Sequence, residues 1–386
     1  MKQKRIFAAA VLILLTAFFY HRFTRTLTFF EVTEEFERPM EMTVPEGLSS
    51  LSAEECALCH EDIYNEWKSS IMAQAWTEPY FQVDFVWDNS MQVCKNCHTP
   101  LADQQEYLVL GFNDSAKLDP ILEPNPNYDP SLQNEGVTCV VCHVKDGVIL
   151  GPYDLKTDAH PTRKDDRFTD GNSVCKRCHW VKGDRWDMFL KLPPCGNFAE
   201  IEETGKKVNC VKCHMPRVTR AMATGGPVRN GGRHLWRGGH DPKMVKSAAK
   251  IELTEEADST PEKRRYTLSV TNVGTEHRLP TGTPDRHLEV SFRLYDADGK
   301  LIKKKRHFLE RIILWRPFMV DLRDTRLKYQ QTRSYSFNFS TNSNPKPALL
   351  VAEVRYGLLH ESRRKRIGYK NKKPIKYSIF QKKIPL

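Results

Sequence analysis

Apolar and polar residues alternate along several segments in the last third of the chain. Every second side chain is apolar over residues 266–270, 288–294, 335–339 and 350–356. A two-residue period is typical of half-buried β-strands, and Asp298-Gly299 between two of these segments is a hairpin signal. The sequence therefore predicts a small antiparallel, Ig-like β-sandwich over residues 250–386 that carries no cofactor attachment motif.

The preceding part of the chain has a different pattern. Ile63, Trp67, Ile71 and Ala75 recur at four-residue spacing and predict one amphipathic helix. The remainder of residues 50–245 is rich in turn-forming residues, so we expect short helices joined by long loops. The expected fold class is α+β multidomain, with a mainly helical and loop-rich module followed by the β-sandwich.

The amino terminus reads as a targeting segment. Lys2, Lys4 and Arg5 precede an apolar run from residue 6 to residue 20, which predicts a signal peptide or an N-terminal membrane anchor within residues 1–30. Fifteen apolar residues are short for a spanning helix, which needs about 20. However, Leu15-Thr16-Ala17 is a poor cleavage site, and the aromatic and basic flank at residues 18–22 resembles an interfacial belt. We therefore favour a retained anchor in the inner membrane and expect a periplasmic or cell-envelope location.

Five Cys-x-x-Cys-His motifs stand between residues 56 and 214. They are Cys56/Cys59/His60, Cys94/Cys97/His98, Cys139/Cys142/His143, Cys175/Cys178/His179 and Cys210/Cys213/His214. In such motifs two thiols form thioethers with the haem vinyl groups and the adjacent imidazole reaches the iron. The sequence therefore predicts five covalently bound c-type haems, with the ten cysteines as attachment points and the five histidines as proximal ligands.

Zinc is the alternative use of paired cysteines. Zinc sites do not require a histidine directly after the second cysteine, whereas all five motifs have one, so we favour haem. The motifs use ten of the eleven cysteines. Only Cys195 is left over, and we expect a buried and inert thiol there.

The second axial ligands decide whether a haem iron is closed, as in electron transfer, or open to small molecules. His160, His234 and His240 are candidates, and the glycines flanking the last two would let the backbone approach a flat macrocycle. Met72 is a further candidate, because methionine ligation raises the haem potential relative to a second histidine. Twelve helical residues from His60 to Met72 would span about 18 Å, so Met72 would have to serve the haem of another motif.

The chain resembles the multihaem c-type cytochromes related to the tetrahaem electron acceptors of hydroxylamine oxidoreductase, especially members with a C-terminal β-sandwich. The resemblance rests on residues 67–75, on Cys-Val-Lys-Cys-His-Met-Pro at residues 210–216, on the segment from His234 to His240, and on Asn272 to Gly282. In the family a histidine often occupies the place of Met72, so this chain departs from the pattern there. The resemblance also implies that His277 is a distal ligand.

The charge is unevenly distributed. Residues 301–386 contain 22 Lys or Arg and 5 Asp or Glu, a balance of +17, whereas the remaining residues have 37 basic and 43 acidic side chains, a balance of −6. A basic C-terminal part suits docking to an acidic redox partner or an anionic membrane, and we do not expect nucleic acid binding.

These features predict an electron carrier that passes electrons between a donor and an acceptor protein, with no catalytic residues. The alternative is a reductase or oxidase of a small nitrogen or sulfur compound with one open haem. No Cys-x-x-Cys-Lys variant marks such a haem. A further alternative is a ligand donated in trans within a larger assembly.

Overall fold

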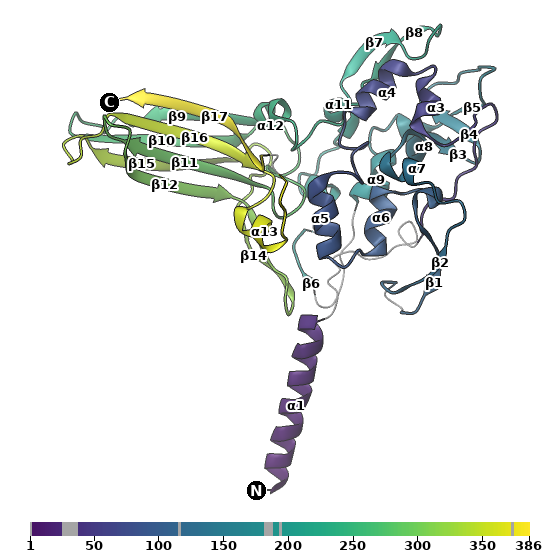
Figure 1. Ribbon diagram of the computed structural model, residues 1–386. Helices are drawn as coiled ribbons and strands as arrows, with labels where there is room; N and C mark the ends of the chain where they lie inside the picture. The colour runs from purple at the N-terminus through teal and green to yellow at the C-terminus, as the bar shows by residue number, and fades with distance from the viewer. Residues whose placement is uncertain (1, 25–37, 115–116, 181–187, 193–194, 372–373) are drawn as a thin grey trace.

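The computed structural model describes residues 2–24, 38–114, 117–180, 188–192, 195–371 and 374–386. Three parts are visible in Figure 1: the long helix α1, a body of short helices and loops, and a group of long strands that ends with the C-terminus. We call the body of residues 38–248 the N-terminal part and residues 249–386 the C-terminal part.

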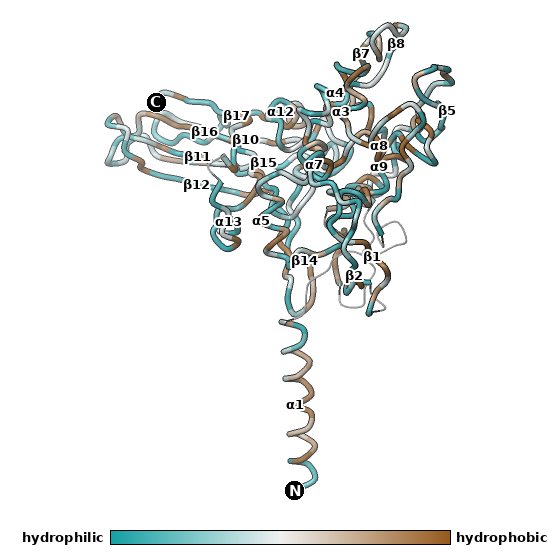
Figure 2. The backbone as a smooth tube through the Cα atoms, turned by 45° about the vertical axis from the view of Figure 1, so that its right-hand side comes forward, coloured by the Kyte–Doolittle hydropathy of each residue, from teal (hydrophilic) through white to brown (hydrophobic). Residues whose placement is uncertain are grey.

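Helix α1 (Lys2–Thr24) points away from both parts. Its 23 residues span about 35 Å, because an α-helix rises about 1.5 Å per residue. Among the described residues it is the one helix that is long and apolar enough to cross a membrane, judged by length and composition. Figure 2 shows it hydrophobic along most of its length and hydrophilic at its N-terminal end. Polar residues at both ends thus extend the predicted 15-residue apolar run to a length that matches a bilayer.

The N-terminal part contains short helices, loops and small sheets. Its helices are α3 (Ala53–Ala57), α4 (Glu61–Lys68), α5 (Pro79–Trp87), α6 (Gln92–His98), η1 (Ala102–Gln104), α7 (Pro130–Asn134), α8 (Cys139–His143), η2 (Asp166–Phe168), α9 (Ser173–His179), α10 (Phe198–Glu202), α11 (Cys210–His214) and α12 (Pro242–Ala248). The small sheets pair β1 (Tyr107–Phe112) with β2 (Pro120–Pro124), β3 (Val144–Lys145) with β4 (Val148–Gly151) and β5 (Thr162–Lys164), and β7 (Arg217–Ala221) with β8 (Val228–Gly232).

The prediction of a helix that extends to Ala75 is wrong in its length. Helix α4 ends at Lys68, and the chain continues in turns. The Ser69 hydroxyl donates to the Glu66 carbonyl at 2.7 Å, and the Ser70 hydroxyl accepts from the Met72 amide at 3.2 Å. Such local bonds compete with helical hydrogen bonds and end the helix. The estimate of about 18 Å between His60 and Met72 assumed a continuous helix, so it does not apply.

Two antiparallel sheets form most of the C-terminal part. One has the order β12-β11-β16-β17 and the other β15-β10-β9. Their strands are β9 (Ala249–Glu255), β10 (Lys263–Asn272), β11 (His287–Tyr295), β12 (Leu301–Leu309), β15 (Thr332–Ser340), β16 (Leu349–Gly357) and β17 (Lys376–Pro385). All four predicted alternations are strands, which confirms those predictions.

The two sheets share one hydrophobic core of 19 buried residues. Phe292 of β11 stacks on Phe337 of β15 with ring centroids 5.1 Å apart. The described buried clusters of the N-terminal part are much smaller, with five and three buried residues. Apolar side chains alone therefore stabilise the C-terminal part far more than the N-terminal part.

A third sheet joins the two parts of the molecule. The hairpin of β13 (Arg311–Leu314) and β14 (Met319–Asp324) adds the short strand β6 (Met188–Phe189) in parallel next to β14. The hairpin extends toward α1 in Figure 1. Helix α13 (Glu361–Arg366) lies beside it, between β16 and β17 in sequence.

Candidate functional site

The cysteine–histidine motifs lie on short helical turns. Helices α8 and α11 each consist of a motif alone, and α6 and α9 each end on a motif histidine. Residues at positions i, i+3 and i+4 of a helix share one face. A single turn thus directs both thiols and the imidazole of a motif to the same side, which is the arrangement that covalent attachment to a planar group needs.

Four of the five motif imidazoles are held in the same way. Each Nδ1 lies against a backbone carbonyl, in the pairs His60 with Met222 at 2.6 Å, His98 with Ala75 at 2.6 Å, His143 with Leu150 at 2.7 Å, and His214 with Arg237 at 2.7 Å. A carbonyl can only accept, so Nδ1 must carry the proton, and in the neutral imidazole Nε2 then keeps its lone pair. This is the tautomer and orientation typical of histidines that bind a metal through Nε2.

The third motif has a second imidazole facing it. The rings of His143 and His234 have centroids 6.1 Å apart. Two metal–nitrogen bonds of about 2 Å each, together with the two half-rings, add up to roughly 6 Å, so the separation fits two imidazoles on opposite sides of one metal ion. The Nδ1 of His234 also faces a carbonyl, that of Gly232, at 3.0 Å. Burial lowers the pKa of His234 to about 4, so the imidazole is neutral at pH 7 and can act as a ligand.

A buried carboxylate holds the segment that carries His234. Glu66 on α4 is 6% exposed, and its oxygens accept from the His234 amide at 2.9 Å, from Arg233 Nε at 2.7 Å, and from both terminal nitrogens of Arg220 at 2.8 and 2.9 Å. Burial raises the pKa of Glu66, but the hydrogen bonds from the two arginines outweigh burial and lower it overall. Glu66 is therefore ionised at neutral pH and ties the His234 loop to the helix that follows the first motif.

Two further candidate ligands, His160 and His277, lie in the neighbourhood of motif histidines. Burial lowers the pKa of His160, and the nearby His60 lowers it further. Burial likewise lowers the pKa of His277, and His214 adds to this effect. These effects place His160 in the neighbourhood of the first motif and His277 in that of the fifth, just as the effect of His60 on the pKa of His143 places the first motif near the third.

The other two candidate ligands have different surroundings. His240 is exposed, and its Nε2 faces Arg286 of the C-terminal part at 3.0 Å. Met72 is partly buried and packs against the apolar cluster of Ala53, Trp67 and Ala73, where Cys139 and Trp236 also pack. The contacts of Met72 are those of a core side chain next to the third motif.

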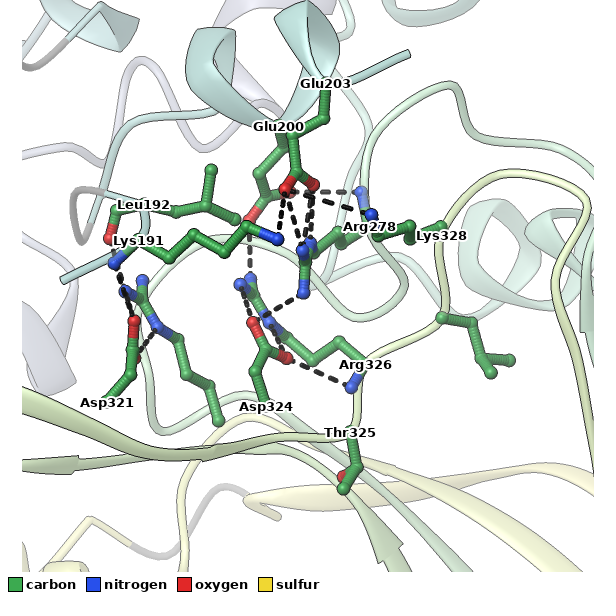
Figure 3. Close-up of polar contacts among 12 residues, drawn as sticks. Lys191, Leu192, Glu200, Glu203, Arg278, Asp321, Asp324, Thr325, Arg326 and Lys328 are labelled. Atoms are coloured by element: carbon green, nitrogen blue, oxygen red, sulfur yellow. Dashed lines mark hydrogen bonds and ion pairs between the residues drawn. The ribbon is translucent and has the colours of Figure 1, made fainter.

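An ion-pair network secures the His277 segment (Figure 3). Glu200 on α10 accepts from the Arg278 amide at 3.1 Å and from Arg326 at 2.5 Å, and both side chains of the Glu200–Arg326 pair are 3% exposed. Arg278 also binds Glu203 at 2.8 Å and Asp324 at 2.7 Å. The network joins the two parts of the chain directly beside His277. A cavity of about 180 Å³ lies here and is lined by His277, Arg278, Glu200, Glu203, Thr204, Lys206, Lys328 and Tyr329.

The five motifs are close neighbours of one another. Thiols of different motifs shift each other's pKa in three neighbouring pairs: Cys56 with Cys139, Cys97 with Cys178, and Cys175 with Cys210. Burial and, to a smaller extent, the charge of Cys178 raise the pKa of Cys142 to about 12, which places the third motif next to the fourth. The motifs thus neighbour each other in the pairs first–third, third–fourth, second–fourth and fourth–fifth, and the fourth stands at the branch.

Cys195 has the properties of an unreactive thiol. Burial raises its pKa to about 12, and the charges of Asp84 and Asp285 contribute. The thiol is therefore protonated at neutral pH. The same carboxylates link α5 to the C-terminal part, because Tyr80 donates to Asp285 at 2.7 Å and Arg363 donates to Asp84 at 2.5 Å.

Sequence reasoning missed the groups that position the imidazoles. No sequence motif marks Glu66, Arg220 or Arg233. The two arginines are more than 150 residues away in sequence from the carboxylate that they bind. The carbonyl acceptors of the motif histidines are backbone atoms, for which side-chain identity gives no signal. Only the spacing of Glu66 from the first motif, on a strongly amphipathic segment, hinted at a helix that could carry such a group.

Comparison with known proteins is informative at the level of structure. No protein-family model matches the chain, and no curated protein sequence matches it. The crystal structure of a penta-haem cytochrome c552 from Thermochromatium tepidum superposes with a TM-score of 0.65 at 22% sequence identity, covering 89% of this chain and all of that one. A β-glucuronidase from Bacteroides uniformis matches 29% of the chain with a TM-score of 0.16, which is too low to carry an argument. The chain therefore has a mixed α+β fold shared over nearly its whole length with a multihaem cytochrome c.

Proposed function

We propose that the chain is a pentahaem c-type cytochrome that transfers electrons between redox partners in the bacterial cell envelope. The observation that carries the proposal is the common orientation of four motif imidazoles, each with Nδ1 on a carbonyl and Nε2 left for a metal. The shared fold with a penta-haem cytochrome supports it. The proposed covalent attachment points are Cys56, Cys59, Cys94, Cys97, Cys139, Cys142, Cys175, Cys178, Cys210 and Cys213, and the proposed proximal ligands are His60, His98, His143, His179 and His214.

Three axial pairs follow from proximity. His143 pairs with His234, supported by the 6.1 Å separation of their rings. His60 is the proposed partner of His160, and His214 that of His277, because each motif histidine contributes to lowering the pKa of the candidate ligand near it. His240 and Met72 remain candidates for the irons of the second and fourth motifs, although the exposure of His240 and the core packing of Met72 make them weaker ones.

Bound haem would supply an iron that gains and loses one electron, and the chain determines where that electron goes. The neighbour relations of the motifs support a branched path, in which the fourth haem lies beside the second, third and fifth, and the first joins through the third. Burial lowers the pKa of His98, His143 and His234, so these imidazoles are neutral at pH 7, and each is anchored through Nδ1 and can hold its position while the iron charge changes.

The C-terminal part has a separate role in this proposal. In this proposal, residues 50–245 form the module that binds the five haems. Residues 250–386 form a separate, basic, Ig-like sandwich built from the two sheets. The charge of +17 in residues 301–386 would steer an acidic redox partner toward the molecule. The similarity of several segments to electron acceptors of hydroxylamine oxidoreductase supports this assignment, and the N-terminal segment would place the protein at the periplasmic face of the inner membrane.

The test is electron paramagnetic resonance on the oxidised holoprotein, after haem content has been measured against protein mass. We expect five haems per chain and low-spin signals. Fewer than five haems would overturn the pentahaem assignment. A substantial high-spin signal at full haem loading would instead favour the alternative, a reductase or oxidase of a small nitrogen or sulfur compound with one open haem.

Docking is tested separately by the dependence of electron transfer on salt. We expect reduction or oxidation by an acidic partner protein to slow as ionic strength rises, because the Debye length falls from about 30 Å at 0.01 M to about 10 Å at 0.1 M. Rates that stay flat over this range would contradict steering by the basic C-terminal part, while leaving the haem assignment intact.

A further inference from the structure

The end of α1 is bound to the hairpin of β13 and β14. Arg22, in the last turn of the helix, is 2% exposed, and its Nε donates to the Pro317 carbonyl at 2.7 Å. In return, Arg316 donates to the carbonyls of Arg22 at 3.2 Å and Phe23 at 2.5 Å. The last carbonyls of a helix have no partner within the helix and carry its negative dipole end, so an arginine there both caps and stabilises the helix. A pair of arginines thus fastens the helix end to the hairpin tip.

Aromatic contacts extend this attachment along the side of the helix. The Phe318 ring lies 6.2 Å from the ring of Phe18 and 6.3 Å from that of Phe189 on β6, and the guanidinium of Arg22 lies 5.2 Å from its centre. Phe18 precedes the helix end at Thr24 by six residues, which is about 9 Å along the axis. The Phe318 side chain therefore lies alongside the last two turns of α1, while the hairpin tip ends beside the end of the helix (Figure 1).

The strands behind the tip expose apolar side chains to solvent. Phe189 is 59% exposed, Leu314 42% and Leu322 61%, and all three belong to the sheet that contacts α1. Exposed leucines and phenylalanines that gather next to a helix of bilayer length are typical of a membrane-facing surface. Trp315 and Arg316 stand at the same tip, and tryptophan and arginine are side chains that favour the layer between lipid tails and water.

The depth of the tip follows from the length of α1. The helix is about 35 Å long, whereas the hydrocarbon layer is about 30 Å thick, so a spanning helix has its ends near the two surfaces. Lys2, Lys4 and Arg5 favour the cytoplasmic side for the first end. The other end then lies at the opposite surface, and because the hairpin tip is bound to this end, the tip lies at the level of the headgroup layer.

We propose that the tip of the β13–β14 hairpin, residues 314–318, inserts into the headgroup layer of the bilayer that α1 spans, as a second membrane contact. This tip and α1 together fix the orientation of the haem-motif body relative to the membrane, which a single helix on a linker cannot do. The inference rests on retention of α1, which the proposed location includes, and not on the haem assignment.

The experiment uses the full-length holoprotein in nanodiscs that contain a phospholipid with a photoactivatable diazirine near its headgroup. After illumination, the chain is digested and lipid adducts are mapped by mass spectrometry. We expect adducts in α1 and in the peptide covering residues 312–318, and background levels in the β7–β8 hairpin, which lies on the side of the molecule away from α1 and exposes Val228.

Matched variants make the result specific. Phe318→Ser should lower the adducts at residues 312–318 to the level of β7–β8 and leave those in α1 unchanged, whereas Val228→Ser should change neither. Haem content is measured on every variant, so a failure of haem loading is recognised separately. Adducts in α1 alone, adducts in neither segment, or equal adducts in β7–β8 would each overturn the proposal. An intact mass that begins after Ala17, or a cross-link of the tip to another membrane protein in place of lipid, would do so as well.

Discussion

Replacement of Glu66 by alanine should open the iron of the third motif. In the structure this carboxylate is the acceptor for the His234 amide and for two arginines. Removal leaves Arg220, which is 18% exposed, without its closest carboxylate and releases the backbone of the segment that carries His234. The proposed proximal ligand His143 keeps its own carbonyl partner, so the two axial positions should respond differently.

The size of the effect follows from the burial of the pair. Breaking a buried ion pair on one side costs about 3–5 kcal/mol. Arg233 is 45% exposed and can be solvated in the variant, so the lower end, about 3 kcal/mol, applies here. Because every 1.4 kcal/mol is a factor of ten, the equilibrium between bound and displaced His234 should shift by roughly 100-fold.

Carbon monoxide provides the assay, since it binds ferrous haem only where an axial position is free. We expect the reduced wild-type protein to bind little carbon monoxide at this haem and Glu66→Ala to bind up to one additional equivalent, with a matching high-spin signal after oxidation. Glu66→Gln keeps the shape and some hydrogen bonds, so its effect should be smaller. If alanine impairs haem attachment, the glutamine variant carries the test.

Glu353→Ala is the matched control. Glu353 is 2% exposed and pairs with Arg293 at 2.6 Å and Arg355 at 3.2 Å, but it lies in the sheets of the C-terminal part. Its loss should cost comparable stability without any change in carbon monoxide binding. The reasoning is refuted if Glu66→Ala, with all haems loaded, stays low-spin and binds no more carbon monoxide than this control.

Three further predictions concern other contacts. Arg326→Ala should lower the free energy of unfolding by about 3–5 kcal/mol in urea titrations, because it leaves the buried Glu200 carboxylate short of its partner; a loss below 1 kcal/mol would contradict the role given to this pair. Met72→Leu should cost less than about 1.5 kcal/mol and leave the low-spin signals unchanged, since Met72 packs as a core residue; a new high-spin haem would show instead that its sulfur is a ligand. Burial raises the pKa of Asp84 to about 6, so its contribution to stability is full below its unfolded value near 3.8 and is lost as pH rises through 6, by up to about 3 kcal/mol. Asp84→Asn should flatten the stability profile between pH 4 and pH 7, and an unchanged profile would contradict the assignment.

The sequence alone determined the strands with clean alternation and, through the five motifs, the proposal of haem attachment. Attachment of a planar group by two thiols and an imidazole depends on spacing within five residues, and a half-buried strand shows its period along its own length. Both are local properties, so they can be read without tertiary contacts. The same kind of inference failed after Ser69. The four-residue spacing of apolar residues continues to Ala75, but hydrogen bonds of the serine hydroxyls end the helix at Lys68.

The tertiary structure alone decided how the motifs are arranged and which histidines face them. His143 and His234 are 91 residues apart in sequence, and their approach depends on Glu66, which no motif marks. The attachment of α1 likewise depends on Arg22 meeting Pro317, 295 residues away. Such contacts are set by the paths of loops and by buried charges whose partners are distant in sequence, and these long-range pairings leave no periodic trace in the sequence itself.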